Sequence, residues 1–477
     1  MEWRKKSLAG VLLSLMAASV ARAGGSLEGR IQALLGSDLV KGASISLDVV
    51  EVTPKGPVEL YGYHATTPLG PASNCKLLTT SAAFEKYGAK AAFKTMLYKV
   101  GDDLLIVGGG DPGLGDSKLA AANGETVTKP FEDWAATLKN AGITSYRDLI
   151  VDDRVFDSQW VHPNWPADQR LDWYSAPVGG LNFNANCLDW LPTLTGKGVT
   201  VELIPHTTYV SVVNKASRGP RTLVSLIRPA DSNKFELRGT ISATATTPLS
   251  VPIYDPGLWT GTILRDVLAN QGITATGNVR RIEDGEQLTG ATLLASHATP
   301  ILSVIKRADT DSLNMMAESL CKRLGHDATG QPGSWTNGPA AVKTYLANLG
   351  IQDDWATLDD GSGLSNKNKV AAKVFTTVLA HVAATPDADA FVNCLATPGE
   401  DGTLRNRFKA KPCADAIHAK TGHITGVSTL SGFIDVPSAG GKPRRIVFSI
   451  LCNKYKGNVN PWQDDVCEAI YDWASGK

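Results

Sequence analysis

Hydrophobic and polar positions change their spacing several times along the chain. Apolar residues have helical spacing over residues 27–39, and the stretch ASISLDVVEV then alternates as a half-buried strand does. A helix is expected over about residues 73–87, and strand-like stretches joined by turns follow to about residue 250. Helical spacing returns in GLWTGTILRDVLANQG and SVIKRADTDSLNMMAESLCKRLG, and the chain ends in strands and a helix over about residues 461–474. Helices and strands at both ends of a strand-rich middle predict one domain interrupted by an insertion.

The first 23 residues have the three parts of a cleaved secretory signal. A basic start is followed by an apolar run from Leu8 to Val20 and by small residues at Ala21 and Ala23. No later stretch approaches the roughly 18 consecutive apolar residues that a spanning helix needs. We therefore expect a soluble, exported protein, periplasmic or extracytoplasmic, with no transmembrane segment after signal cleavage.

The charge balance gives no reason to expect a polyanionic partner. The chain has 47 Lys and Arg residues against 47 Asp and Glu residues, and removal of residues 1–23 leaves a net charge of about −3. A nearly neutral chain carries no electrostatic signal for nucleic acid or for an anionic membrane surface. We expect neither as a partner.

The chain has seven cysteines but no Cys-x-x-Cys pair, which argues against a zinc ribbon or a thioredoxin-like redox site. Export would permit disulfides. Cys394 with Cys413, or Cys452 with Cys467, is a plausible pair, although the sequence does not determine the pairing.

A serine stands three residues ahead of a lysine in GPASNCKLLTT, at Ser73 and Lys76. The pattern is weak, since about two matches are expected by chance in a chain of this length, and it occurs again at Ser303 and Lys306. At Ser73, however, a loop leads into an apolar helix, where the helix dipole acts on the serine and the lysine lies on the same face. From this motif alone, an N-cap serine and a solvated lysine remain the favoured interpretation.

Two further motifs change that interpretation. Ser312 and Asn314 form Ser-x-Asn within a predicted amphipathic helix, and Lys-Thr-Gly at residues 420–422 lies on a predicted strand. Ser-x-x-Lys, Ser-x-Asn and Lys-Thr-Gly in this order are the signature set of the serine penicillin-recognising enzymes. Three matches in order, on the expected elements, are hard to obtain by chance.

These residue types meet the demands of acyl transfer. A serine hydroxyl is a poor nucleophile until a neighbouring base takes its proton. Lys76 can be that base if its pKa is lowered, and like-charge repulsion from Lys420 is the expected cause. Ser312 is suited to relay the proton to a leaving amine.

The remaining motif groups suit a peptide substrate. Asn314 has both a donor and an acceptor for a substrate amide. Lys420 and Thr421 would receive a carboxylate, and Gly422 lets the ligand backbone approach closely. Backbone N–H groups of Ser73 and His423 are the candidates for an oxyanion hole.

A closer resemblance runs over nearly the whole mature chain. It is carried by PASNCKLLTTSAAFEKYG, DDLLIVGGGDPGLG, LIVDDRVFD, WYSAPVGGLNFNANC, DSLNMMAESL, LDDGSGLSNKNKV and AKTGHITGVSTLSGFI. Together these stretches resemble the D-alanyl-D-alanine carboxypeptidases of the penicillin-binding protein 4 type, peptidase family S13. That family carries a large insertion between the first two motifs, and about 240 residues separate Ser73 from Ser312 here.

The resemblance implies a role for each motif residue. Ser73 would be the acylated nucleophile and Lys76 its base. Ser312 and Asn314 would form the second motif, and residues 420–422 the third.

Four other features stand beside the motifs. Cys75 and His423 depart from the residues usual at these positions, but neither removes a needed functional group. The resemblance suggests that Tyr174 lines the pocket for the stem-peptide side chain, while packing between domains is the simpler interpretation of its aromatic neighbourhood. DGSGLS, residues 360–365, recurs in the family and is interpreted as a tight turn with a structural role.

The expected fold class is a multi-domain α/β (α+β) protein. A transpeptidase/β-lactamase-like domain, with an antiparallel sheet flanked by helices, would comprise residues 24–97 and 290–477. An inserted domain would comprise residues 98–185 and 248–289, and a smaller strand-rich domain would comprise residues 186–247.

The resulting functional hypothesis is a serine D,D-carboxypeptidase or D,D-endopeptidase. It would act on peptidoglycan stem peptides through a Ser73 acyl-enzyme and would be acylated by β-lactam antibiotics, with no metal or organic cofactor. A β-lactamase is one alternative, although the Glu-x-x-x-Asn spacing typical of class A is absent. A catalytically inert peptidoglycan-binding scaffold is another, although all the catalytic side chains are present.

Overall fold

A computed structural model describes residues 25–477 of the protein, apart from 284, 287–288, 401, 439–440 and 442. The expected secretory signal, residues 1–23, lies outside the described residues. None of the helices within the described part of the chain combines the length and the apolar character needed to cross a membrane.

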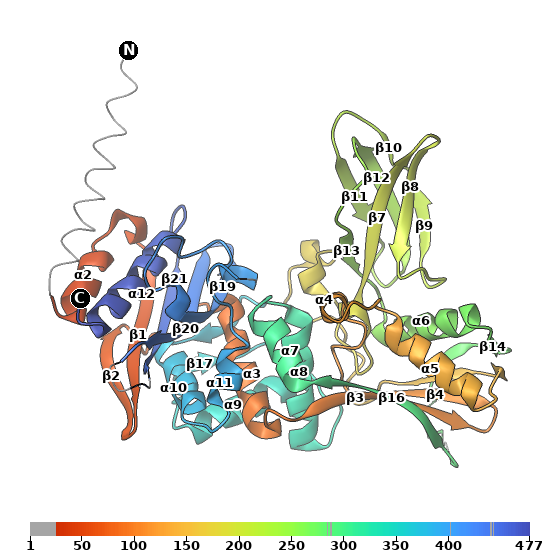
Figure 1. The fold of residues 1–477 in the computed structure, drawn as a ribbon, viewed down its shortest axis with the longest axis horizontal. Helices are drawn as coiled ribbons and strands as arrows, with labels where there is room; N and C mark the ends of the chain where they lie inside the picture. The colour runs from red at the N-terminus through yellow and green to blue at the C-terminus, as the bar shows by residue number, and fades with distance from the viewer. Residues whose placement is uncertain (1–24, 284, 287–288, 401, 439–440, 442) are drawn as a thin grey trace.

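A five-stranded antiparallel sheet joins the two ends of the chain (Figure 1). Its strands, in spatial order, are β19 (Ile417–Ile424), β20 (Val427–Val436), β21 (Arg444–Asn453), β1 (Ser44–Thr53) and β2 (Gly56–Tyr63). We call it the first sheet. Side chains along β21 point alternately to the two faces of the sheet. Val447 and Leu451 lie in one hydrophobic cluster, and Phe448 and Ile450 lie in another. Both faces of the sheet are therefore covered.

Helices cover these two faces unequally. One face packs against α2 (Leu27–Leu35) and α12 (Asn460–Ala474). The other face packs against a larger group of helices: α3 (Cys75–Tyr87), α7 (Ile301–Asp309), α8 (Asn314–Thr329), α9 (Asn337–Asn348), α10 (Ala372–Ala383) and α11 (Ala388–Val392). Two short strands, β17 (Ala356–Thr357) and β18 (Lys369–Val370), lie outside the sheet.

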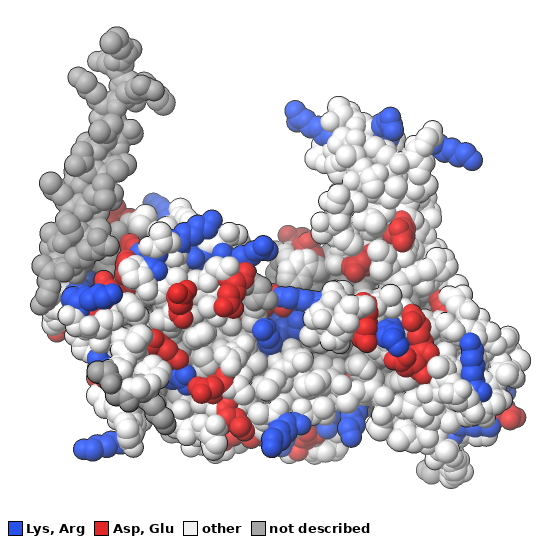
Figure 2. Space-filling view, viewed as in Figure 1, with Lys and Arg blue, Asp and Glu red and all other residues white. Residues whose placement is uncertain are grey.

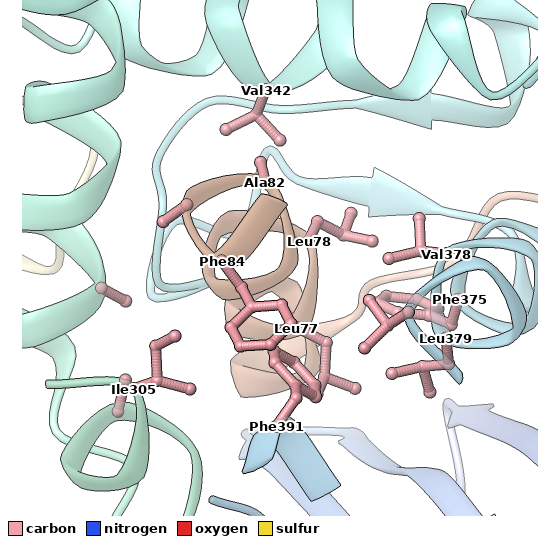
Figure 3. Close-up of a cluster of buried hydrophobic side chains, with 14 of the residues drawn as sticks. Leu77, Leu78, Ala82, Phe84, Ile305, Val342, Phe375, Val378, Leu379 and Phe391 are labelled. Carbon is pink, nitrogen blue, oxygen red and sulfur yellow. The ribbon is translucent and has the colours of Figure 1, made fainter. Parts of the chain in front are cut away.

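Helix α3 is the centre of this larger group. Leu77 and Phe84 on α3 pack among side chains of α7, α10 and α11, as Figure 3 shows. A 3₁₀ turn, η2 (Ala72–Asn74), leads into the helix, and Gly88 ends it with a positive φ of 75°. The helix expected over about residues 73–87 is therefore present, and Ser73 lies in the turn that precedes it.

A second five-stranded sheet, of mixed direction, lies beside the larger helical group. Its order is β15 (Val279–Arg281), β6 (Leu149–Asp152), β4 (Asp103–Gly108), β3 (Ala92–Val100) and β16 (Thr292–Pro300). Helices α5 (Lys129–Asn140) and α6 (Pro256–Asn270) pack with it, near the short elements α4 (Ser117–Ala122), β5 (Ser145–Tyr146) and β14 (Thr274–Ala275). Because β3 pairs with both β4 and β16, the expected boundaries at residues 97 and 290 divide this sheet between two of the expected domains.

The strand-rich middle of the chain projects from the second sheet (Figure 1). One of its two small sheets has the order β13 (Leu249–Pro252), β7 (Cys187–Thr195) and β8 (Gly198–Ile204). The other contains β9 (Ser211–Asn214), β10 (Ser217–Arg218), β11 (Leu223–Ile227) and β12 (Lys234–Ile241). On the visible face of the body, basic and acidic side chains are interspersed, as Figure 2 shows.

Two sequence-based expectations about helices were wrong. Helix α5 lies in a stretch interpreted as strands, although Phe131, Trp134, Ala135 and Leu138 are buried at helical spacing. The helix expected to contain the second motif is broken, because α7 ends at Asp309 and α8 begins at Asn314. The break removes Ser312 from any helix.

The seven cysteines, all within the described part of the chain, are buried free thiols. Cys394 and Cys413 pack in clusters on opposite faces of the first sheet, so that plausible pair is wrong. Cys452 and Cys467 share one cluster but are not joined.

Truncation of Leu77 tests the central position of α3. Leu77 is fully buried, whereas Leu223 is 69% exposed. We expect Leu77→Ala to lower the free energy of unfolding by about 2–5 kcal/mol, because it removes buried methyl groups and leaves a cavity. The matched control Leu223→Ala should change it by less than about 0.5 kcal/mol. Urea unfolding followed by tryptophan fluorescence measures both, and equal effects would contradict this packing.

Candidate functional site

The three sequence motifs meet where η2, the α7–α8 break and β19 come together. Turn η2, which carries Ser73, packs directly on β19 and β20. A Cβ added at Gly422 would lie 2.7 Å from the carbonyl oxygen of Pro71 and 3.0 Å from the backbone nitrogen of Asn74. Only glycine permits so close an approach, and the approach brings Ser73 to the third motif.

Lys76 connects the first motif to the second. Its Nζ donates hydrogen bonds to Ser73 Oγ at 2.9 Å, to Asn314 Oδ1 at 2.6 Å and to the carbonyl oxygen of Ser362 at 3.0 Å. The side chain is fully buried. Three acceptors therefore satisfy the three N–H bonds of a buried ammonium group.

Lys420 makes a separate set of contacts. Its Nζ donates to Ser312 Oγ at 2.9 Å and to the carbonyl oxygen of Thr421 at 2.6 Å. Like Lys76, this lysine is fully buried. The two ammonium groups thus contact different hydroxyls, those of Ser73 and Ser312.

Ser312 has a backbone conformation that a non-glycine residue rarely adopts. Its φ is +62°, in the left-handed region. The neighbouring backbone N–H of Leu313 donates to the Arg307 carbonyl at 3.1 Å, and the Asp311 carboxylate pairs with Arg307 at 2.5 Å and with Lys118 at 2.6 Å. These contacts hold the strained residue so that its hydroxyl faces Lys420.

Burial is the main influence on both lysines. It lowers the pKa of Lys76 to about 8, against an opposing effect of the Glu318, Asp360 and Asp309 carboxylates. Burial, followed by repulsion from Lys76, lowers the pKa of Lys420 well below its usual range. We expected repulsion from Lys420 to be the main cause of the lowered Lys76 pKa, and this expectation was wrong. The largest contribution to the lowered pKa is the removal of Lys76 from water.

Two buried acids lie near the lysines. Burial raises the pKa of Glu318 to about 7 and that of Asp309 to about 7. Glu318 accepts backbone hydrogen bonds from Gly361 at 3.0 Å and Ser362 at 2.8 Å. The 360–365 segment is thereby held so that the Ser362 carbonyl faces Lys76.

Comparison with known proteins identifies the family. Residues 27–475 match the D-Ala-D-Ala carboxypeptidase 3 (S13) family. A D-alanyl-D-alanine carboxypeptidase of Actinomadura sp. is 30% identical over 455 residues, which are 90% of this chain and 81% of the relative. The carboxypeptidase DacB of Haemophilus influenzae is 26% identical over 82% of both chains.

The chain belongs to the D-Ala-D-Ala carboxypeptidase 3 (S13) family. It is therefore a serine-type D-Ala-D-Ala carboxypeptidase. The crystal structure of penicillin binding protein 4 (dacB) from Haemophilus influenzae has the same fold, with a TM-score of 0.75 at 24% identity over 93% of this chain and 99% of that one. The expected fold class is confirmed.

The other predicted residues of this S13 protein lie around the motifs in different ways. Tyr174 reaches the site through its backbone, because its carbonyl accepts a hydrogen bond from Asn314 Nδ2 at 2.8 Å, while its hydroxyl donates to Asp172 at 2.8 Å. His423 is exposed, and its Nδ1 lies 3.4 Å from the Tyr455 hydroxyl. Thr421 is half-buried on β19 beside Gly422.

Cys75 lies under the site and away from solvent. Its Sγ is 3.7 Å from the Asp360 carbonyl, and burial raises the pKa of this thiol well above its usual range. The side chain is 1% exposed. The interpretation of Cys75 as a small packed residue therefore agrees with its surroundings.

Sequence reasoning missed three groups near the lysines. Glu318 follows Asn314 by four residues on α8, a spacing that places both on one helix face and was a usable signal. No sequence pattern pointed to Asp309. The carbonyl of Ser362 was also missed, because DGSGLS was interpreted only as a turn. Within the described part of the chain, no cluster of three or more His, Cys, Asp or Glu residues is suited to hold a metal ion.

Gly422→Ala tests the close approach of η2 to β19. The added Cβ would meet backbone atoms of η2 and its approach at 2.7 and 3.0 Å, which moves Ser73 away from the third motif. We expect labelling of Ser73 by a penicillin to slow by at least about ten-fold. Gly196→Ala is the matched control, since a Cβ there meets nothing within 4 Å. Equal labelling rates in the two variants would contradict the argument.

Proposed function

We propose that this S13 protein hydrolyses the terminal D-alanyl-D-alanine bond of peptidoglycan stem peptides through an acyl-enzyme on Ser73. One observation carries the proposal: Nζ of the fully buried Lys76 lies 2.9 Å from Ser73 Oγ, with a pKa of about 8. A lysine with this pKa is partly neutral near neutral pH and can accept the serine proton.

The acylation step follows from these contacts. In its neutral form, Lys76 takes the hydroxyl proton as Ser73 Oγ attacks the carbonyl carbon of the penultimate D-alanine. The carbonyl electron pair moves onto oxygen, where the backbone N–H groups of Ser73 and His423 would stabilise it. As the tetrahedral intermediate collapses, the C–N bond breaks and the terminal D-alanine leaves.

The leaving amine needs a proton, and the second motif is placed to provide it. Ser312 Oγ lies 2.9 Å from Lys420 Nζ. The Ser312 hydroxyl would pass its proton to the leaving nitrogen and would take a replacement proton from Lys420. Lys420 and Thr421 would hold the terminal carboxylate, and Asn314 the peptide amide. Water then hydrolyses the Ser73 ester, which restores the enzyme.

The same serine would react with β-lactam antibiotics. Opening of the ring acylates Ser73 but keeps the leaving group tethered in the way of water, so the adduct persists. Family membership favours a peptidase over the β-lactamase alternative. The hydrogen-bonded Ser73–Lys76 pair counts against an inert scaffold.

The place of action follows from the substrate. Peptidoglycan lies outside the cytoplasm, and the secretory pattern of residues 1–23 would direct the chain there. We therefore place the enzyme in the periplasm or another extracytoplasmic space. Cleavage of cross-bridges between stems would be the endopeptidase form of the same step, with Tyr174 near the stem-peptide side chain.

Intact-protein mass spectrometry with benzylpenicillin tests the nucleophile. We expect one stable adduct of one drug mass on the wild type and none on Ser73→Ala. Ser303→Ala is the matched control, because Ser303 and Lys306 repeat the Ser-x-x-Lys pattern within α7. An adduct that survives in Ser73→Ala would overturn the assignment, and drug consumed without a lasting adduct would favour a β-lactamase.

The pH dependence of acylation tests the base. Only neutral Lys76 can accept the proton, so the acylation rate constant should rise with pH, pass its midpoint near pH 8 and level off above it. Lys76→Arg stays protonated at these pH values and should not be acylated. Lys306→Arg serves as the control and should keep the wild-type profile. A profile that is flat from pH 6 to 9.5 would contradict the role of Lys76 as the base.

A further inference from the structure

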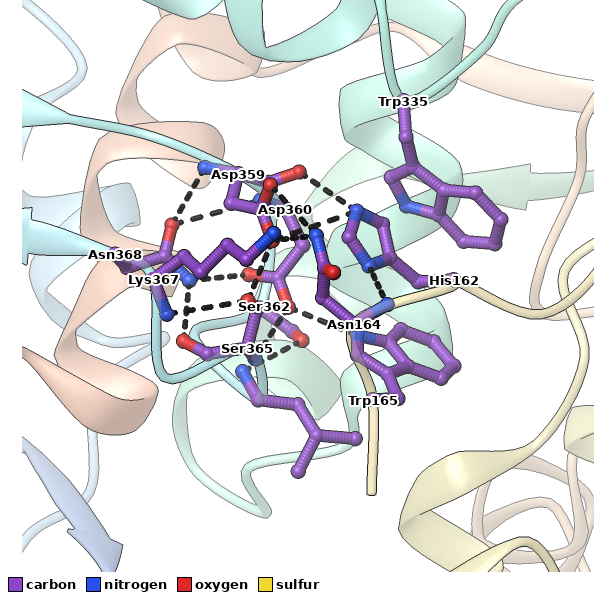
Figure 4. Close-up of polar contacts among 12 residues, drawn as sticks. His162, Asn164, Trp165, Trp335, Asp359, Asp360, Ser362, Ser365, Lys367 and Asn368 are labelled. Carbon is purple, nitrogen blue, oxygen red and sulfur yellow. Dashed lines mark hydrogen bonds and ion pairs between the residues drawn. The ribbon is translucent and has the colours of Figure 1, made fainter. Parts of the chain in front are cut away.

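A short segment that follows strand β6 in the chain contacts the loop beside the catalytic lysine. This segment, residues 162–165, faces Asp359 and Asp360, as Figure 4 shows. The His162 ring accepts the backbone N–H of Asn164 at Nδ1, so its Nε2–H donates to the Asp359 carbonyl at 2.9 Å. The Asn164 amide donates to the Asp359 carboxylate at 3.0 Å.

Trp165 makes the innermost of these contacts. Its indole N–H donates to the Asp360 carboxylate at 2.9 Å, and both side chains are almost completely buried, at 5% and 1% exposure. A buried hydrogen bond to a charged acceptor is stronger than one between neutral groups. The segment thus holds Asp360 as well as packing against it.

Asp360 in turn organises the loop around itself. Its carboxylate accepts backbone N–H groups of Gly363 and Ser365, each at 2.7 Å, and the side-chain amide of Asn368 at 2.8 Å. Glu318 holds the same loop from α8 through Gly361 and Ser362. Between these two carboxylates, the Ser362 carbonyl points at Lys76 Nζ, 3.0 Å away.

We propose that Trp165 is a positioning residue for the catalytic base: its indole N–H orients the Asp360 carboxylate, which holds the loop that presents the Ser362 carbonyl to Lys76. The inference rests on the proposed function, in which Lys76 takes the Ser73 proton. Ser362 accepts one Lys76 N–H, which leaves Ser73 Oγ and Asn314 Oδ1 to receive the other two. Displacement of the carbonyl would let the amine rotate away from Ser73.

Packing alone would require the ring of Trp165 but not its N–H. The ring lies against Trp335 in an edge-to-face arrangement, with centroids 5.5 Å apart. Phenylalanine keeps an aromatic ring at this place and removes the donor. Trp165→Phe therefore separates the two interpretations.

The test is the acylation of full-length Trp165→Phe by benzylpenicillin, followed from pH 6 to 9.5. We expect the limiting acylation rate constant to fall by about ten-fold, while the concentration for half-maximal rate changes less than two-fold, because the altered group acts on the base and not on the drug. We also expect the midpoint of the pH profile to move down by about half a unit, since the ammonium form of Lys76 loses an acceptor.

Trp259→Phe is the matched control. Its buried indole N–H donates to the Phe183 carbonyl at 3.0 Å, away from the motifs. This variant should lose similar thermal stability but keep the wild-type rate and midpoint. If Trp165→Phe slows acylation no more than Trp259→Phe and leaves the midpoint unchanged, Trp165 only packs and the proposal is overturned.

A closer mimic of tryptophan covers the case in which Trp165→Phe does not fold. Benzothienylalanine placed at residue 165 alone keeps the two fused rings but has a sulfur atom in place of the indole N–H that Asp360 accepts. We expect this variant to show the slowing and the midpoint shift given above for Trp165→Phe. A wild-type profile in this variant would overturn the proposal. A wild type that gives no Ser73 adduct would instead contradict the proposed function, so the two failures are distinguishable.

Discussion

Burial of the Lys76 ammonium group is the constraint on which the rest of the site depends. Removing a charged amine from water is costly unless its hydrogen bonds are replaced. The protein replaces all three, with the hydroxyl of Ser73, the amide oxygen of Asn314 and the carbonyl of Ser362. The cost that remains lowers the pKa of the lysine to about 8, and this makes it a usable base.

A second buried lysine, Lys420, adds to the cost of burying positive charge in the site. Lys420 lies close enough to Lys76 for the two charges to repel, yet each donates to a different serine. Buried carboxyl groups at Glu318 and Asp309, with pKa values raised to about 7, offset part of the positive charge. The charges within the site therefore change near neutral pH, where the acylation chemistry needs both forms of Lys76.

Three distant parts of the backbone must be placed accurately for these contacts to form. Gly422 lets η2 lie directly on β19, and Ser312 adopts a left-handed conformation at the break between α7 and α8. The 360–365 loop brings the Ser362 carbonyl to the amine while Glu318 and Asp360 hold its N–H groups. Since Trp165 in turn holds Asp360, a segment outside the first sheet and its helices reaches the base through Asp360 and the loop that carries Ser362.

The sequence by itself determined the local features: the apolar helix after Ser73, the strands near the C-terminus, and the order and types of the motif residues. Periods of 3.6 and 2 residues and short motifs are local, so they can be seen without a fold. Helix α5 was also encoded locally and was overlooked. Only the tertiary structure decided the break before Asn314, burial as the main cause of the lowered Lys76 pKa, and the contacts of Ser362 and Trp165. These depend on segments far apart in the chain, and no spacing along the sequence encodes the distance between them.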